Sequence, residues 1–368
     1  MNPDLPSITG IGTVSSFGPL RGLIARKEVE PRPIIAWPTE GLRRAFLVEP
    51  FRPADVVPGL KTRRLDRLSV WCLVAAGLAM QDAKLDLEKE DRSRIAVVLG
   101  TGLGCIELTE SFFQSIATNG YGKSDPIIFP EGLSNAPASH VARIFGVRGP
   151  NLTLSHKSVS GEGALMQAAS LLRTAQADTV IVLAGDTLTR TTYEWYEAAG
   201  ALSPACFGPA PVPVASSQTR EGFVPGEGAA AVVMESGQRA ARRGAPMYAA
   251  FRSGHATSNP KAALSVTRKA LGTSSLSGVK MVIASANGSR AHDDVEEAII
   301  REVFGAEARV VAPKACLGEF DSSGLLRLIT ALSWSEPDTR SLALLLGTST
   351  TGITAALSFD LSCTPTAA

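Results

Sequence analysis

Short apolar runs alternate along this chain with stretches in which apolar residues recur at helical spacing. The apolar runs are rich in β-branched residues, as expected of strands that are buried on both faces. They lie at residues 94–100, 178–185, 279–284 and 342–346. Apolar spacing predicts helices at residues 162–175, 294–304 and 325–334. Because strands and helices alternate, the pattern predicts an α/β fold.

The most apolar stretch, residues 70–80, has charged residues on both sides. It is too short to cross a bilayer, which takes about 20 residues, so we expect a buried helix and no membrane association. The first six residues lack the basic and apolar regions of a secretory signal.

A polar segment at residues 236–246 is the best candidate for a boundary inside the chain. The alternation of strands and helices begins again after it. A chain of 368 residues is long enough for two lobes or for one large α/β unit. We therefore expect two halves, residues 1–246 and 247–368.

Composition excludes several classes of protein. The 36 basic residues are balanced by 35 acidic ones, so the chain lacks the basic excess of a protein that binds nucleic acid. The five cysteines are scattered singly, which indicates neither a disulfide framework nor a metal site and is typical of the cytoplasm. Gly100, Gly102 and Gly104 lack the spacing of a dinucleotide-binding loop. We expect no metal and no cofactor.

Ser158 lies where a predicted strand breaks into small residues and becomes a helix. Unpaired amides and the helix dipole favour an anion at such a place, which suits a nucleophile. A cysteine there would gain thiolate character, whereas a serine also needs a general base. Serine is equally a preferred helix cap. Both roles stay open at this point.

Several motifs, taken in chain order, resemble the elongating β-ketoacyl-acyl carrier protein synthases of fatty acid and type II polyketide assembly. The clearest are VRGP at residues 147–150, Ser160-Gly161, and REGFVPGEG at residues 220–228. Weaker ones lie at residues 8–12, 64–67, 100–104, 314 and 352–359. The resemblance covers nearly the whole chain, and the set is specific although each motif alone is weak.

The resemblance implies a thiolase-like α-β-α-β-α layered sandwich of two pseudo-symmetric halves, assembled as a dimer. Catalysis in that family uses one cysteine and two histidines, with a nearby lysine. The cysteine position falls on Ser158, and the two histidine positions fall on Asn287 and Glu319. Of the four, only Lys314 is retained. We expect Glu319 to pair with Lys314 and to fill the old site.

This loss points to a subunit that does not catalyse condensation. Each catalytic acid or base is worth roughly 10² to 10⁴ in rate, so losing the thiol and both histidines leaves no useful route to a condensation. Similar degenerate members of the family are chain-length factors of type II polyketide and aryl polyene pathways. We expect a heterodimer with an active ketosynthase, which would supply the chemistry, receive acyl carrier protein and share a chain tunnel.

Residues of that tunnel can be suggested by their position. The candidates are Leu108, Phe112, Phe129 and Thr350. For the first three, membership of an ordinary core is the alternative. Thr350 stands where the family carries an aromatic residue in a glycine-rich loop.

The strand before Ser158 is expected to pair across the dimer, as this segment does in the family. The interface candidates are Asn151, Thr153, Ser155, His156 and Lys157. Arg63, Arg64 and Arg67 could contact an acidic carrier protein or form a solvated helix face.

Two other functions remain open. One is an acyltransferase or malonyl carrier protein decarboxylase that uses Ser158; the other is a homodimeric scaffold for carrier protein or an acyl chain. His292 could reach Ser158, or it could mark a solvated helix start beside Asp293 and Asp294.

Overall fold

We describe the chain from a computed structural model. The structure describes residues 4–24, 29–34, 37, 41–123, 128–208, 220–272, 278–305, 309–334, 341–349 and 352–361.

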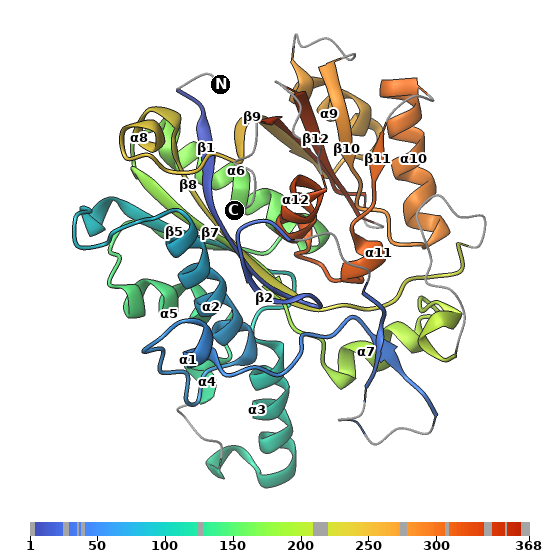
Figure 1. Cartoon of the computed structure of the whole chain (residues 1–368). Coiled ribbons are helices and arrows are strands. Elements are labelled where there is room, and N and C mark those ends of the chain that lie inside the picture. Colours follow the sequence, from blue (N-terminus) through green and yellow to red (C-terminus); the bar gives the residue numbers. More distant parts are fainter. Residues whose placement is uncertain are drawn as a thin grey trace.

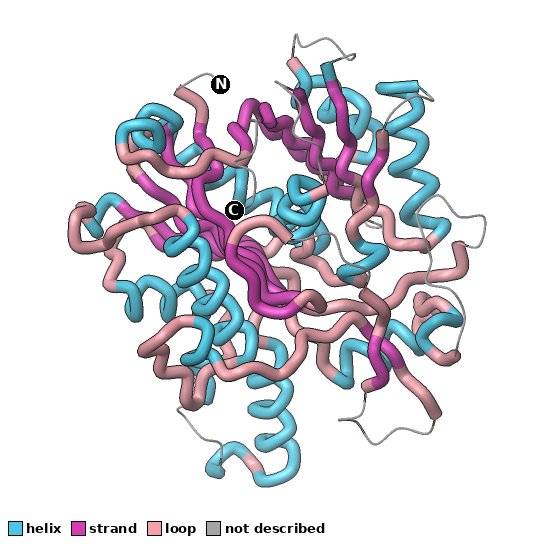
Figure 2. Tube along the Cα trace, in the orientation of Figure 1, coloured by secondary structure: helices cyan, strands magenta, loops and turns pink. Residues whose placement is uncertain are grey.

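One large mixed sheet runs through the part of the chain that the structure describes (Figures 1 and 2). The strand order is β11-β10-β12-β13-β9-β1-β8-β7-β5-β6, with β2 paired to β1 and a separate hairpin of β3 and β4. The strands are β1 Pro6–Ser15, β2 Gly18–Arg21, β3 Arg32–Pro33, β4 Arg44–Ala45, β5 Ile95–Gly100, β6 Asn151–Leu154, β7 Thr179–Asp186, β8 Gly228–Ser236, β9 Ala249–Thr257, β10 Val279–Ile283, β11 Val310–Val311, β12 Ser341–Thr348 and β13 Thr354–Leu361.

The sheet consists of two groups of strands with the same internal order and orientation. In the first group β1, β8 and β7 are antiparallel, and β7, β5 and β6 are parallel. In the second group β9, β13 and β12 repeat the antiparallel part, and β12, β10 and β11 repeat the parallel part. The groups join where Ser7 and Ile8 of β1 pair with Ala250 and Ala249 of β9.

Helices lie on both faces of each group of strands. They are α1 Pro53–Val56, α2 Arg67–Asp82, α3 Ile106–Asn119, α4 Ile128–Glu131, α5 Ala136–Phe145, α6 Ser160–Arg173, α7 Arg190–Ala198, α8 Gly237–Arg242, α9 Ala263–Leu271, α10 Arg290–Phe304, α11 Lys314–Leu317 and α12 Gly324–Ser333. Helices α2 and α5 cover the outer face of the first group, and α9 and α10 cover that of the second. Between the groups, α6 and α12 contact strands of both, which gives the predicted α-β-α-β-α layers.

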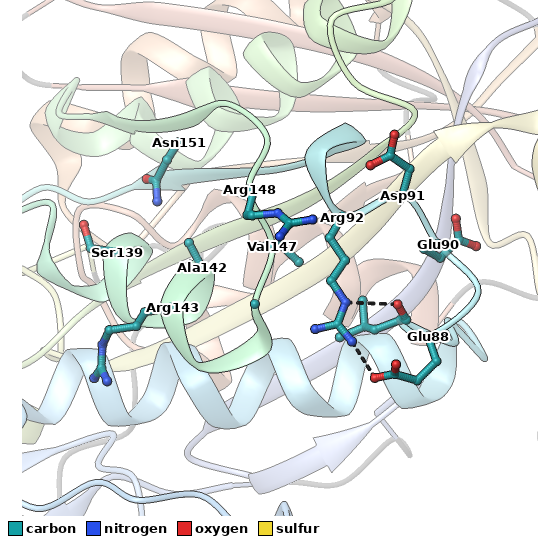
Figure 3. A pocket seen from close by; sticks show the side chains of 12 residues that line it. Glu88, Glu90, Asp91, Arg92, Ser139, Ala142, Arg143, Val147, Arg148 and Asn151 are labelled. Atoms are coloured by element: carbon teal, nitrogen blue, oxygen red, sulfur yellow. Dashed lines mark hydrogen bonds and ion pairs between the residues drawn. The ribbon is translucent and has the colours of Figure 1, made fainter.

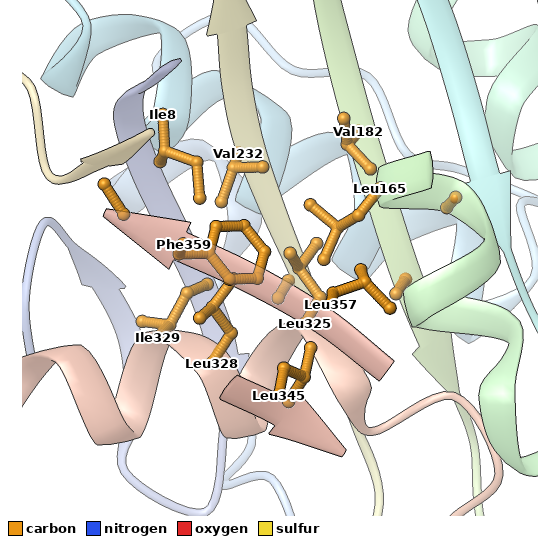
Figure 4. Close-up of a cluster of buried hydrophobic side chains, with 14 of the residues drawn as sticks. Ile8, Leu165, Val182, Val232, Leu325, Leu328, Ile329, Leu345, Leu357 and Phe359 are labelled. Atoms are coloured by element: carbon orange, nitrogen blue, oxygen red, sulfur yellow. The ribbon is translucent and has the colours of Figure 1, made fainter. Parts of the chain in front are cut away.

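The central core lies around this middle layer. Leu165 of α6 and Leu325 of α12 pack against Val182 of β7 and against Leu345 and Leu357 of the second group (Figure 4). Burying one such side chain stabilises the fold by roughly 1.5–3 kcal/mol relative to leaving it exposed. The two groups of strands therefore share one core.

Helix α2 confirms the expected buried helix at residues 70–80. The Asp66 side chain accepts a hydrogen bond from the Leu68 backbone N–H at 2.8 Å, which caps the helix. The helix is apolar on nearly every side because it is covered on all of them. Within the described ranges, no helix is both long enough and apolar enough to cross a membrane.

The predicted elements are present with shifts of a few residues at their ends. The helix expected at residues 162–175 is α6, and the strand expected at 342–346 is the longer β12. The thiolase-like α/β fold is thus confirmed. The division of the chain at residue 246 stays a prediction.

Candidate functional site

A cavity of about 630 Å³ lies where the start of α3, helix α7 and the loops of the second group of strands meet. Its wall includes Ser158, Asn287 and Glu319, the positions that correspond to the family's cysteine and two histidines, and also the interface candidate Lys157. A segment of the first half and two loops of the second half are therefore brought together at one place.

Ser158 lies in a short 3₁₀ turn, Lys157–Val159, directly before α6. Its Oγ donates a hydrogen bond to Oδ1 of Asp321 at 3.1 Å. The capping alternative for Ser158 is wrong, because α6 begins with no side-chain cap. Ser160 fixes this turn instead: its Oγ accepts from the His156 backbone N–H at 2.9 Å and donates to the Lys157 carbonyl at 2.7 Å.

Asp321 is the functional candidate that sequence reasoning missed. Burial raises the pKa of its carboxyl to about 6, and the negative charges of Asp186 and Glu319 add to the rise. Gly102 lies against it, since a Cβ at that position would come within 2.2 Å of the Asp321 Cβ. The sequence offered one signal for Asp321: it follows the predicted site residue Glu319 by two positions, on the same loop.

Asp186, at the end of β7, fixes the loops around this pair. Its carboxylate is fully buried and accepts hydrogen bonds from the Thr101 hydroxyl and from the backbone N–H groups of Gly102 and Leu103, at 2.8–3.0 Å. Its other oxygen accepts from the Ser322 N–H and hydroxyl. Burial raises the pKa of Asp186 despite these bonds. Asp186 thus positions the loop that carries Asp321.

The predicted ion pair between Lys314 and Glu319 is confirmed. The Lys314 Nζ lies 2.9 Å and 2.7 Å from the two carboxylate oxygens of Glu319. The Asn287 Nδ2 donates to the same carboxylate at 2.5 Å. Both charged residues are buried. The three side chains therefore bind one another.

The REGFVPGEG segment holds the loops of this network in place. The Glu319 N–H donates to the Val224 carbonyl, and the Gly226 N–H donates to the Glu319 carbonyl, both at 2.9 Å. The backbones cross so closely that a Cβ at Gly226 would lie 2.1 Å from the Leu317 carbonyl oxygen. This contact explains why glycine stands at position 226.

His292 and Asp293 are buried, so the expectation of a solvated helix start is wrong. The His292 Nε2 donates to the Thr348 carbonyl at 3.0 Å, and its Nδ1 lies 3.3 Å from Asp293 Oδ1. Burial alone would lower the pKa of His292, but the hydrogen bond to Asp293 and the charges of Glu296 and Glu319 raise it overall. Both ring nitrogens are occupied, and the Ser158 hydroxyl is directed to Asp321 instead.

The cavity wall also contains an aromatic group that sequence reasoning missed. Tyr196 packs against Trp195 and Phe223, with ring centroids 5.4 Å and 5.0 Å apart. Burial raises the pKa of Tyr196 strongly, and the charges of Asp321 and Glu319 act in the same direction. The cavity thus has one aromatic side and one polar side.

Among the described residues that line this cavity there is none of the tunnel candidates. Leu108 and Phe112 are half-buried on α3, and the Phe112 ring lies 5.6 Å from that of Phe129. Phe129 is 52% exposed, so an ordinary core role is wrong for it. Thr350 lies outside the described residues, although Ser349 borders the cavity. Their role in a tunnel stays a prediction.

The interface candidates lie at one end of the large sheet. Strand β6 is the last strand in the order and pairs with β5 alone in the part described. Asn151, Ser155, His156 and Lys157 are exposed, and Thr153 is half-buried.

A second cavity, of about 800 Å³, borders the start of β6 (Figure 3). Arg92, Arg143 and Arg148 line it together with three acidic residues, Glu88, Glu90 and Asp91. Among the predicted site residues it contains Asn151. This cavity therefore belongs to the expected interface region and not to the cavity of Ser158.

The three arginines near α2 differ in their surroundings. Arg63 and Arg64 are exposed. Arg67 lies 3.1 Å from the buried carboxylate of Glu227 and stacks over the Trp71 ring at 5.1 Å. Arg67 is therefore held in the fold, and a contact of Arg63 and Arg64 with an acidic protein stays a prediction.

The layered sandwich of two repeated groups of strands has the thiolase-like fold. Residues 12–240 match the model of the β-ketoacyl synthase N-terminal domain, and the chain belongs to the β-ketoacyl synthase family.

Two relatives show how far the similarity extends along the chain. Nodulation protein E of Rhizobium leguminosarum bv. trifolii is 29% identical over 301 residues, which cover 76% of this chain and 73% of that protein. The chloroplastic 3-oxoacyl-acyl carrier protein synthase I of Arabidopsis thaliana is 28% identical over 340 residues, covering 84% and 71%. Among solved structures, the ishigamide ketosynthase/chain length factor matches with a TM-score of 0.86 at 21% identity, over 97% of this chain and 99% of that one.

Proposed function

We propose that this chain is a chain-length factor: a subunit that does not condense acyl chains, pairs with an active ketosynthase and shapes the tunnel for the growing chain. One observation carries the proposal. The three positions that the family uses for its cysteine and histidines hold Ser158, Asn287 and Glu319, and the last two are bound into a network with Lys314.

This network opposes condensation for an electrostatic reason. A condensing site needs hydrogen-bond donors directed at the oxygen on which negative charge develops. Here Glu319 presents a carboxylate, and the Asn287 amide and the Lys314 ammonium both donate to that carboxylate. A condensation would require this buried pair to open, which is costly because it leaves charges unpaired.

The surfaces expected to meet a partner support pairing. Strand β6 presents one free edge in the described part of the sheet, and such edges readily pair with a second chain. Figure 1 shows α3 extending away from the body of the molecule. Phe113 on α3 is 61% exposed, and Phe129 on α4 is 52% exposed. Both rings contact Phe112, and exposed apolar groups that gather in one place support a protein interaction site there.

A carrier protein is proposed to reach this chain through the complex. The family acts on acyl groups that are attached to such a protein, and carrier proteins are acidic. Arg63 and Arg64 offer an exposed basic contact, whereas Arg67 is already bound to Glu227. Cytoplasmic location stays a prediction.

Co-expression tests the pairing. The partner to be tested is a ketosynthase with an intact cysteine and two histidines, sought among the neighbouring genes. We expect a soluble 1:1 heterodimer by size-exclusion chromatography with light scattering. A stable homodimer that ignores the ketosynthase would contradict the proposal and favour the scaffold alternative.

Paired substitutions locate the interface. Replacing Phe113 and Phe129 with aspartate places charges in the proposed contact, so we expect heterodimer affinity to fall at least tenfold. Val295→Asp on α10 is the matched control, because Val295 is also exposed, at 51%, but lies on another helix. An equal loss of affinity in the double variant and in the Val295→Asp control would show that α3 and α4 are not part of the interface.

A further inference from the structure

Ser158 and Asp321 form a hydroxyl–carboxylate pair on the cavity wall that chain-length control does not use. The Ser158 Oγ lies 3.1 Å from Asp321 Oδ1, and both residues border the cavity. Nearby polar groups are largely occupied: Asn287 and Lys314 bind Glu319, and His292 binds Thr348. This hydroxyl and this carboxylate therefore remain to face a bound molecule.

We propose that Ser158 accepts an acyl group from an apolar acyl thioester, with Asp321 as its general base. This inference goes beyond the proposed function and does not depend on it. A subunit that cannot condense can still carry an acyl group on an oxygen ester.

The step balances without a further reactant. The Ser158 Oγ forms an ester bond with the acyl carbonyl carbon, and the carbon–sulfur bond of the thioester breaks. The hydroxyl proton passes to the Asp321 carboxylate and from there to the departing thiolate. Asp321 ends the step ionised, as it began, and the thiol leaves as a neutral product.

Lys157 gives this wall its positive charge. It borders the cavity next to Ser158 and has a φ of 51°, which is unfavourable for a residue with a side chain. Strained backbone of this kind clusters at functional sites. The positive charge of Lys157 acts on Asp321, and a positive charge at the cavity stabilises the negative charge that develops on the carbonyl oxygen.

The wall selects the class of acyl group. Trp195, Tyr196 and Phe223 provide an aromatic side for an apolar chain. Glu110 and the ionised Asp321 border the same cavity and repel a carboxylate. The proposed substrate is therefore an uncharged acyl thioester and not a malonyl one.

Asp321 is suited to act as a base near neutral pH. Its carboxyl, with a pKa of about 6, is surrounded by Asp186 from β7, Glu319 from its own loop, Lys157 from the 3₁₀ turn and Tyr196 from α7. Above that pH it is ionised and can take a proton, and the two acidic neighbours strengthen it as a base.

Intact-protein mass spectrometry with hexanoyl-N-acetylcysteamine tests the proposal on the full chain. We expect the mass to increase by one hexanoyl group, which maps to the peptide that contains Ser158. The rate should rise with pH through about 6, as Asp321 ionises. The adduct should resist neutral hydroxylamine, which cleaves thioesters but not serine esters, and so separates Ser158 from any cysteine.

Variants assign the roles. Ser158→Ala should abolish the adduct, and Ser158→Cys should give one that hydroxylamine removes. Asp321→Asn should slow acylation at least 100-fold and flatten the pH profile. Ser139→Ala, an exposed hydroxyl on α5, is the control and should react like the unchanged chain. Melting curves establish that each variant is folded.

Three results would overturn the proposal: no adduct on the unchanged chain at saturating thioester, an adduct that persists in Ser158→Ala, or an unchanged rate in Asp321→Asn. None of them bears on the heterodimer. Conversely, a chain that forms only homodimers could still be acylated at Ser158, so the two proposals fail separately.

Discussion

The polar groups at the cavity form two sets, a filled side and an open side, which differ in how completely the groups are paired. On one side Lys314, Glu319 and Asn287 bind one another and the charged pair is buried. On the other side Ser158 and Asp321 share one hydrogen bond and remain half-buried. Both sides derive from positions that surround the same site.

A site can therefore lose one chemistry when part of its polar wall is filled, while another part stays open. The filled side stabilises the loops but has no group left for a substrate. The open side keeps a hydroxyl and a carboxylate whose pKa is raised by burial and by like charges. Stability and reactivity are therefore separated across the cavity.

Removing one charge of the Lys314–Glu319 pair, on the filled side, should have the largest effect on stability. Glu319→Ala leaves the Lys314 ammonium buried without its partner, and we expect a loss of about 3–5 kcal/mol in the free energy of unfolding, measured by urea denaturation. The double change Lys314→Met with Glu319→Leu should cost much less, because it removes both charges. A loss below about 1 kcal/mol in the single variant would mean that the pair is not closed in solution.

A change at Asp321, on the open side, should instead raise the free energy of unfolding. Because the folded-state pKa of Asp321 lies above its ordinary value, its contribution favours the folded state at low pH and is lost as the pH rises through about 6. Asp321→Asn removes the cost of holding an ionised carboxylate in this buried place. We therefore expect the free energy of unfolding to rise by about 1–2 kcal/mol at pH 8 and to change little at pH 4. Denaturation at both pH values measures it, and a gain of equal size at both would contradict the electrostatic cause.

The smallest effect on stability is expected on the aromatic side. Trp195 is 66% exposed, so Trp195→Ala should change the free energy of unfolding by no more than about 0.5 kcal/mol. The same variant should weaken the use of hexanoyl-N-acetylcysteamine several-fold, seen as a higher thioester concentration at half-maximal acylation. A large loss of stability with unchanged acylation would place Trp195 in the core and not at the cavity.

The sequence pattern was sufficient for the elements and for part of the site. The strand at residues 94–100 and the helix at 70–80 could be predicted because their apolar patterns are local. The Lys314–Glu319 pair followed from the retained motif, whose spacing brings two opposite charges to one loop.

Other features depend on which loops meet, and local patterns do not contain that information. Asp321 faces Ser158 across 163 positions of sequence, and Gly102 is what lets it approach. His292 and Asp293 looked solvated because charged residues usually mark a surface, whereas here their hydrogen bonds allow burial. Trp195 and Tyr196 carried no signal that distinguished a cavity wall from ordinary packing.

On the proposed function, this chain takes part in chain extension only together with a ketosynthase. The most direct test measures β-ketoacyl product from hexanoyl and malonyl carrier proteins with this chain alone, the ketosynthase alone, the 1:1 complex, and the complex in which the ketosynthase cysteine is alanine. We predict full extension only by the complex with the intact cysteine. Product formed by this chain alone, or by the complex without that cysteine, would contradict the account.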